Sequence, residues 1–165
     1  MDIREVLKKE HILLDIEAST REEVLQQMAE NLLETKAITD ADRFVKQILE
    51  REKLGFTGAG NGIAIPHGVS DQINQILVAV ARVKETVYWE SEQENIPENE
   101  KNVNFIILFA IPQEVTENQE IRYIKVLQTI CQNLMDKEKI KFLMRTQNES
   151  EIINYFNGER RNENG

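Results

Sequence analysis

The spacing of hydrophobic side chains predicts that helices and strands alternate along this chain. Residues 19–38 give the clearest helix, because their apolar positions form one stripe and because Thr20 and Glu23 have the spacing of a capping box. A second helix is predicted over residues 40–52, where the apolar side chains again share one face. The two stripes consist of Val24, Leu25, Met28, Ala29, Leu32 and Leu33, and of Phe44, Val45, Ile48 and Leu49.

Short continuous apolar runs predict the strands. They cover residues 11–16, 76–83 and 103–111, and the last run is apolar enough to be buried on both faces. Residues 90–102 between the last two runs are polar and predict a loop.

Helical periodicity returns after Pro112. One long helix is indicated, followed by two shorter ones over about residues 138–145 and 149–156. The long helix is marked by Ile121, Ile124, Leu127, Ile130, Cys131 and Leu134. Strands separated by helices predict an α/β fold in which helices cover a central sheet. The length of 165 residues suits one domain, which we place at residues 1–157, with residues 158–165 as a disordered tail.

Composition narrows the classes of function. The formal charge of -9 argues against a nucleic-acid partner, because such binding needs clustered Lys and Arg. No apolar run approaches the roughly 20 residues of a membrane span, and the first ten residues lack the apolar core of a signal peptide. The single cysteine, Cys131, cannot form an internal disulfide. We therefore expect a soluble, cytoplasmic protein.

Candidate chemistry concentrates in residues 60–69, "GNGIAIPHGV". The glycines predict a tight turn with positive φ, whose backbone N–H groups can also form an anion-binding concavity. A strand is expected to end at Ile65, and Pro66 then fixes the backbone ahead of His67. Sites in α/β sheets gather at strand ends. A neutral imidazole there can act as a nucleophile at pH 7.

Several other kinds of site lack support. A dinucleotide-binding loop needs a third glycine where Ile63 stands, and a phosphate loop needs Lys and Ser or Thr after the glycines. Two histidines and one cysteine, without helical spacing between the histidines, do not suggest a metal site. We interpret His11 as a structural or surface residue and Cys131 as a core residue, and Ser70 has no second base nearby to activate it. No cofactor is expected.

Phosphoryl transfer needs an in-line path to the nucleophile and donors around the phosphoryl oxygens. Arg51, Thr57 and the amides of the glycine loop at Gly58, Gly60 and Gly62 are the candidate donors. Arg51 can equally be an ordinary solvated residue at a helix end.

The residues "RE" at 51–52 and "TGAGNGIAIPHG" at 57–68 resemble the active-site signature of the enzyme IIA domain of the phosphotransferase system, in its fructose, mannitol and nitrogen-regulatory class. The likeness extends over nearly the whole chain. It implies a mixed central β-sheet with α-helices on both sides, and a phosphotransferase activity in which His67 accepts a phosphoryl group from the phosphocarrier HPr. The phosphoryl group then passes to a cysteine of enzyme IIB, and sugar is phosphorylated as it enters through the membrane enzyme IIC. The family's arginine falls on Arg51, where it is expected to steady the phosphoryl oxygens.

This sequence departs from the family pattern at one position. The family usually has a second histidine at the start of the helix after the central strand, and the matching residue here is Tyr123. A tyrosine can donate one hydrogen bond but carries no positive charge at neutral pH. The alternative for Tyr123 is simple packing on the sheet.

Two functions are compatible with the resemblance. The chain is either a phosphoryl carrier in sugar uptake, or a regulatory phosphoprotein whose phosphorylation state controls a partner protein. The intact loop at His67, and a tail after residue 157 that shows no added module, favour the carrier.

Overall fold

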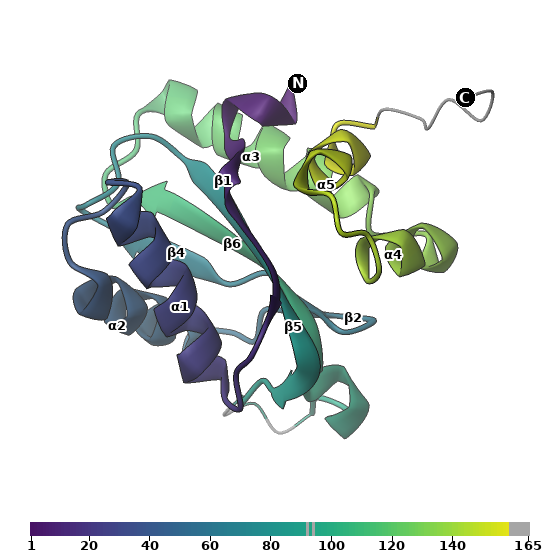
Figure 1. Cartoon of the computed structure of the whole chain (residues 1–165). Helices are drawn as coiled ribbons and strands as arrows, with labels where there is room; N and C mark the ends of the chain where they lie inside the picture. The colour runs from purple at the N-terminus through teal and green to yellow at the C-terminus, as the bar shows by residue number, and fades with distance from the viewer. Residues whose placement is uncertain (92, 94, 159–165) are drawn as a thin grey trace.

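The computed structural model describes residues 1–91, 93 and 95–158, and it shows a mixed sheet with helices on both faces (Figure 1). The strands in this part of the chain are β1 (Leu7–Ile16), β2 (Gly58–Gly60), β3 (Ile63–Ala64), β4 (His67–Ser70), β5 (Leu77–Tyr88) and β6 (Asn102–Pro112). Their order is β1-β5-β6-β3-β2, with β4 also paired to β6. The β1–β5, β3–β6 and β4–β6 pairs are parallel, whereas β5–β6 and β2–β3 are antiparallel.

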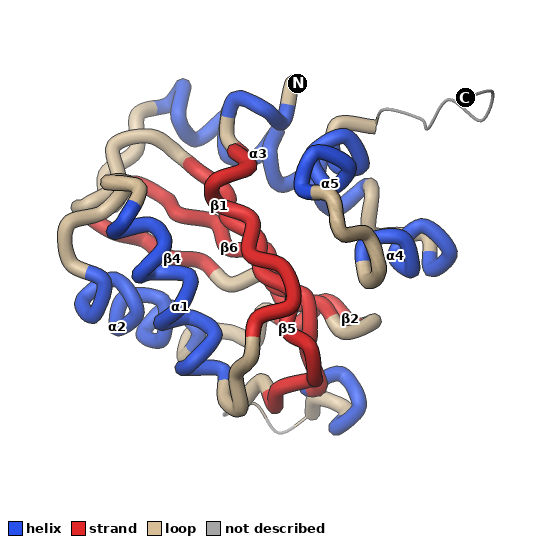
Figure 2. Tube along the Cα trace, in the orientation of Figure 1, coloured by secondary structure: helices blue, strands red, loops and turns tan. Residues whose placement is uncertain are grey.

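The helices form a layer on each face of the sheet (Figure 2). They are α1 (Arg21–Glu34), α2 (Ala41–Glu52), α3 (Glu117–Gln132), α4 (Lys137–Leu143) and α5 (Glu149–Phe156), with short 3-10 turns η1 (Ile3–Glu5) and η2 (Glu98–Lys101). One layer contains α1 and α2, and the other contains η1 and α3 to α5. This arrangement confirms the expected α/β fold. Of the helices described, none is long and apolar enough to cross a membrane.

The central strand β6 is buried on both faces, as its apolar run predicts. Ile106 and Leu108 pack in the core beneath α1 and α2, whereas Ile107 and Phe109 pack in the core beneath α3 to α5. All four side chains have no exposed surface. Because strand side chains alternate between faces, β6 divides the interior into two cores.

The structure corrects several expected boundaries. The first strand begins at Leu7 rather than at residue 11, and the second continues beyond residue 83 to Tyr88. In both cases the added residues are partly polar, because only their backbone groups are needed for pairing. The predicted loop at 90–102 contains η2, and the long helix ends at Gln132. Of the predicted tail, only Gly158 lies within the described residues.

The α1 helix begins where its sequence predicts. Thr20 is the N-cap, and its side chain accepts a hydrogen bond from the amide of Glu23 at 3.1 Å. The Glu23 carboxylate does not return a bond to Thr20 but accepts one from the amide of Ser19 at 2.7 Å. Both side chains of the predicted capping box therefore accept hydrogen bonds at the helix start. The Glu23 carboxylate binds the amide of Ser19, one residue before the N-cap.

A buried arginine ties the α4–α5 layer to the sheet. Arg82 of β5 is 2% exposed, and its Nε and Nη2 atoms donate to the two carboxylate oxygens of Asp15 on β1, at 2.9 and 3.1 Å. Its Nη1 donates to the carbonyl oxygens of Leu143 and Thr146, at 3.0 and 2.7 Å. A buried guanidinium is tolerated here because its hydrogen bonds and its charge are matched by acceptors.

Candidate active site

His67 lies where two short strands succeed one another along β6. The structure corrects the expectation that His67 follows a strand end: β3 ends at Ala64, and His67 is the first residue of β4. It pairs with Phe109 of β6, and its ring stacks on the Phe109 ring with centroids 5.4 Å apart. The imidazole therefore faces the core beneath α3 rather than the α2 side.

Tyr123 of α3 completes the surroundings of this imidazole. Its hydroxyl lies 2.8 Å from Nε2 of His67, and the two rings meet edge-on with centroids 6.1 Å apart. The alternative in which Tyr123 only packs on the sheet does not describe this geometry, since the hydroxyl is hydrogen-bonded to the imidazole. Burial raises the pKa of the Tyr123 hydroxyl, so the hydroxyl keeps its proton at neutral pH.

The imidazole of His67 is neutral at pH 7. Its pKa is lowered to about 4, first because burial disfavours the charged ring and second because the positive charge of Arg51 is nearby. The backbone of Ile65 acts in the opposite direction and is the smallest of the three influences. Nδ1 is buried and forms no hydrogen bond of ordinary geometry within the described part of the chain. Nε2 is thus the nitrogen with a defined polar partner.

Arg51 reaches this site from the other helical layer. It lies in the last turn of α2, and no carboxylate among residues 1–91, 93 and 95–158 forms an ion pair with it. Its positive charge adds to the effect of burial in lowering the pKa of His67 and opposes the larger effect of burial on the pKa of Tyr123, so the guanidinium is within electrostatic range of both groups. The structure therefore brings together the three residues that the sequence singled out at positions 51, 67 and 123.

A glycine beside the histidine allows this approach. A Cβ atom on Gly68 would come within 2.6 Å of Cζ of Phe44 and 3.0 Å of Cγ1 of Ile48, two buried side chains of α2. The absence of a side chain at Gly68 therefore lets α2 lie directly on β4. Close packing of α2 on β4 brings the end of α2, with Arg51, toward His67.

Sequence reasoning gave no role to Glu52, which the structure shows to be a buried anchor. The residue is only 8% exposed. Its carboxylate accepts hydrogen bonds from the Thr57 amide at 3.0 Å, the Thr57 hydroxyl at 2.8 Å and the Trp89 indole at 3.0 Å. Four residues before it, Ile48 lies on the buried face of α2. That spacing was the available signal, because a carboxylate on a buried stripe needs partners. The hydroxyl of Thr57 is thus directed to Glu52.

The glycine turn has the predicted conformation, and its last glycine lies along β6 from the imidazole. Gly60, Asn61 and Gly62 have φ values of 77°, 55° and 81°, which confirms the expected positive-φ turn between β2 and β3. The carbonyl of Gly62 accepts hydrogen bonds from the amides of Asn104 and Phe105. That point is four residues along β6 from Phe109, or about 13 Å. By this register Gly62 lies away from His67 along β6, whereas Gly58 pairs with Ala64 and the Thr57 carbonyl accepts from the amide of Ile65 at 2.8 Å.

His11, Cys131 and Ser70, the other residues considered from the sequence, are buried or half-buried. His11 lies on β1, and its Nε2 is 2.9 Å from the Thr35 hydroxyl. Cys131 of α3 is half-buried against the core beneath that helix, and burial raises the pKa of its thiol. Ser70 is fully buried.

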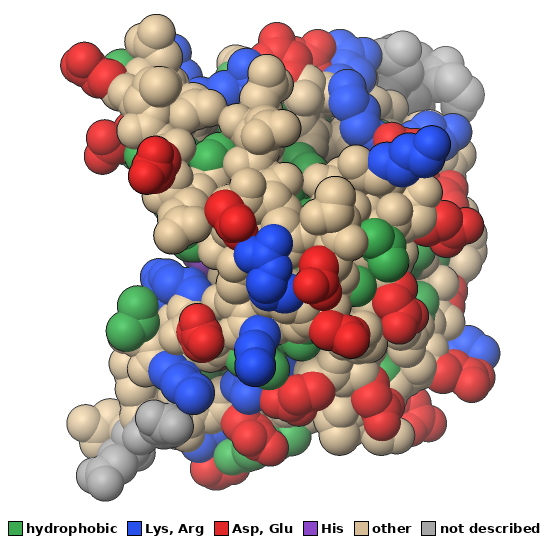
Figure 3. Space-filling view, turned by 90° about the vertical axis from the view of Figure 1, so that its left-hand side faces the viewer, with side chains coloured by type: hydrophobic (Ala, Val, Ile, Leu, Met, Phe, Trp, Pro, Cys, Tyr) green, Lys and Arg blue, Asp and Glu red, His purple; other side chains and the backbone are tan. Residues whose placement is uncertain are grey.

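The surface on the α1–α2 side carries acidic and basic side chains interspersed with one another (Figure 3).

The family model described as "Phosphoenolpyruvate-dependent sugar phosphotransferase system, EIIA 2" matches residues 5–159. A curated relative, the PTS system fructose-like EIIA component of Escherichia coli strain K12, is 33% identical over 127 residues, which cover 77% of this chain and 79% of the relative. Several other curated relatives are far longer, and the chain spans between 14% and 23% of the length of these.

Solved structures agree with the sequence matches. Nitrogen Regulatory Protein IIA-Ntr from Neisseria meningitidis is 27% identical with a TM-score of 0.78, and the match covers 93% of this chain and 98% of that one. In the complex of enzyme IIA mannitol and phosphorylated enzyme IIB mannitol from Escherichia coli, the matched chain is 26% identical with a TM-score of 0.68. That match covers 93% of this chain and 99% of the other.

Proposed function

This chain belongs to the EIIA 2 family of the phosphoenolpyruvate-dependent sugar phosphotransferase system, and we propose that it is a phosphoryl carrier that accepts a phosphoryl group on His67. One observation carries the assignment: a neutral imidazole presents Nε2 to a phenol hydroxyl, with an arginine charge close by. A neutral ring has the lone pair that a nucleophile needs. The nearby donors match the oxygens of the group to be transferred.

The transfer needs no cofactor. Nε2 attacks the phosphorus of phosphohistidine in HPr, so that a new N–P bond forms in this chain while the N–P bond of HPr breaks. For that attack the ring proton must reside on Nδ1, and the Tyr123 hydroxyl donates to Nε2 in the resting state. A cysteine thiolate of enzyme IIB then takes the phosphoryl group, and His67 returns to its neutral form.

Arg51 and Tyr123 are proposed to stabilise the phosphoryl oxygens. Arg51 forms no ion pair within the described residues and is half-buried, so its guanidinium is available to an incoming phosphate. The Tyr123 hydroxyl stands 2.8 Å from Nε2, close to where the phosphorus must arrive. It must therefore turn from the nitrogen to a phosphoryl oxygen during transfer. Thr57 contributes through Glu52, which holds the segment after α2 in place.

HPr as donor and enzyme IIB as acceptor are the partners we propose, with the membrane enzyme IIC acting downstream on the sugar. The solved complex of a related enzyme IIA with phosphorylated enzyme IIB supports the second contact. We also propose that residues 1–157 are the functional domain and that it works in the cytoplasm, where these partners would meet it.

A regulatory role is the second candidate. It is favoured by the likeness to Nitrogen Regulatory Protein IIA-Ntr, whose TM-score of 0.78 exceeds the 0.68 of the mannitol protein. In that case His67 would still be phosphorylated by HPr, but no enzyme IIB would accept the group. Transfer to a cysteine of an enzyme IIB is therefore the step that separates the two functions.

Incubation with enzyme I, HPr and phosphoenolpyruvate tests the proposal. The chain should gain one phosphoryl group that is lost in acid and kept in alkali, as expected for phosphate bound to nitrogen. His67→Ala should abolish the label, and His11→Ala serves as the matched control that keeps it. A label that persists in His67→Ala would falsify the assignment.

A further inference from the structure

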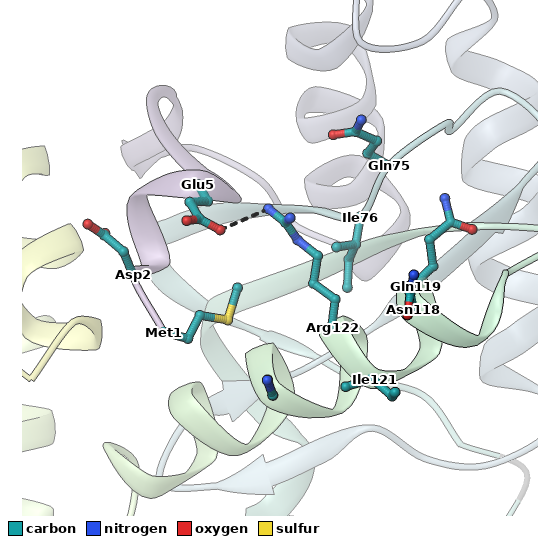
Figure 4. A pocket seen from close by; sticks show the side chains of 10 residues that line it. Met1, Asp2, Glu5, Gln75, Ile76, Asn118, Gln119, Ile121 and Arg122 are labelled. Carbon is teal, nitrogen blue, oxygen red and sulfur yellow. Dashed lines mark ion pairs between the residues drawn. The ribbon is translucent and has the colours of Figure 1, made fainter.

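A pocket of about 500 Å³ opens beside the first half of α3, outside the site of His67 (Figure 4). Its walls come from η1, from the segment between β4 and β5, and from α3. Its α3 residues include Ile121, Arg122 and Lys125, whereas neither His67 nor Tyr123 lines it.

The pocket contains polar groups that are not fully paired. Nη2 of Arg122 lies 3.2 Å from a carboxylate oxygen of Glu5, and Figure 4 shows the guanidinium extending between α3 and η1. Nε of the same arginine is buried and has no hydrogen-bond partner within the described residues. A buried donor of a charged group is costly to leave unsatisfied, and because the Arg122 side chain as a whole is 41% exposed, an acceptor can approach it from the pocket.

Further groups converge on the same space. The ammonium of Lys125, one turn beyond Ile121, forms no ion pair in the described part of the chain. The side-chain amides of Gln75 and Asn118 likewise form no hydrogen bond there. The lining thus offers two cations on one wall, with two carboxylates and three amides around them. The Asp2 carboxylate is already paired with Arg4 at 2.8 Å, and Glu5 is the partner of Arg122.

From this lining we infer a second binding site, for a small hydroxylated phosphomonoester of the sugar-phosphate class. A phosphate can pair with Lys125 and supply the acceptor that Nε of Arg122 lacks, while Glu5 keeps its contact with Nη2 of the same guanidinium. Hydroxyl groups match the remaining lining, because the Glu5 carboxylate accepts from them and the amides can both donate and accept. The volume falls in the range of roughly 300–1,000 Å³ usual for small-molecule sites.

Direct binding of glucose 6-phosphate to the unphosphorylated chain tests this site. Calorimetry should show saturable binding at least tenfold tighter than that of inorganic phosphate, glucose or gluconate. Inorganic phosphate lacks the hydroxyls, glucose lacks the anion, and gluconate has one charge. Amide NMR shifts on titration should centre on Arg122, Lys125 and Gln75 rather than on His67.

Variants decide where the ligand binds. Arg122→Gln and Lys125→Gln should each weaken binding roughly tenfold or more, since each removes a charged donor. Arg43→Gln, which removes an equal charge from exposed α2 surface, should leave binding unchanged, and melting temperatures confirm that all three fold. Absence of saturable binding, equal affinity for inorganic phosphate, or shifts centred on His67 would each overturn the inference. None of these outcomes depends on whether His67 is phosphorylated.

Discussion

Replacing Gly68 by alanine probes the spacing between the strand of His67 and the helix of Arg51. The added Cβ atom would stand 2.6 Å from Cζ and 2.8 Å from Cε2 of Phe44, well inside the 3.4 Å at which ordinary contact begins. Phe44 has no exposed surface, so its ring cannot turn into solvent. The clash must be relieved by moving α2 away from β4.

The loss in free energy of unfolding can be estimated from these contacts. Overpacking a close-packed core by one methyl group costs about 1–3 kcal/mol. Alanine also restricts the unfolded chain, which returns about 0.4–1 kcal/mol. The difference is a net loss of up to about 2.6 kcal/mol, which corresponds to a melting temperature lower by up to about 10 °C for a domain of this size.

The same displacement should slow phosphoryl transfer. Moving α2 withdraws Arg51 from His67, and a displacement of about 1 Å in a positioning group can cost on the order of a hundredfold in rate. Single-turnover transfer from phosphorylated HPr measures the rate, and thermal unfolding measures the stability. Gly55→Ala is the matched control, because a Cβ atom there meets its nearest neighbour only at 3.9 Å.

Two results would count against this reasoning. If Gly68→Ala and Gly55→Ala have the same melting temperature, the contact at Gly68 does not set the distance between α2 and β4. If Gly68→Ala is destabilised but transfers phosphate at the wild-type rate, that distance does not position Arg51.

Four further measurements test the site. Arg51→Lys should slow transfer on the order of a hundredfold, because lysine cannot form the bidentate fork of a guanidinium, and equal rates would make Arg51 an ordinary surface residue. Tyr123→Phe should reduce the transfer rate modestly at an unchanged melting temperature, and Tyr123→His should raise the transfer rate. If both variants lose stability but keep the wild-type rate, Tyr123 serves packing alone. An NMR titration should show His67 neutral down to about pH 4, and Arg51→Gln should raise that pKa. Since the unfolded imidazole binds a proton below about 6.5 and the folded one only below about 4, stability should fall as pH falls through that window, and an ordinary pKa would refute the burial argument.

The sequence by itself determined the main elements and singled out His67 as the candidate nucleophile. Apolar periodicity placed α1 and α2 correctly, and the continuous apolar run marked β6 as buried on both faces. The glycines around Asn61 indicated positive φ, which the turn shows. These features are local, because each depends on side chains within one element or one turn.

The short strands around the histidine could not be predicted in this way. β3 has two residues and β4 has four, too few to display a period. They exist because the long strand β6 supplies backbone partners to both. For the same reason, the sequence placed His67 after a strand, whereas it begins one.

Only the tertiary structure decided which residues meet. His67 and Tyr123 are 56 positions apart. Their contact depends on two features: β4 pairs with β6, and α3 covers the face of the sheet to which the His67 side chain points. Arg82 stands in an apolar strand, and only the folded chain shows that Asp15 and two carbonyl groups surround it. Periodicity reports which side of an element is buried but not which element covers it. Strand order and helix packing make that choice, because they are set by the whole chain at once.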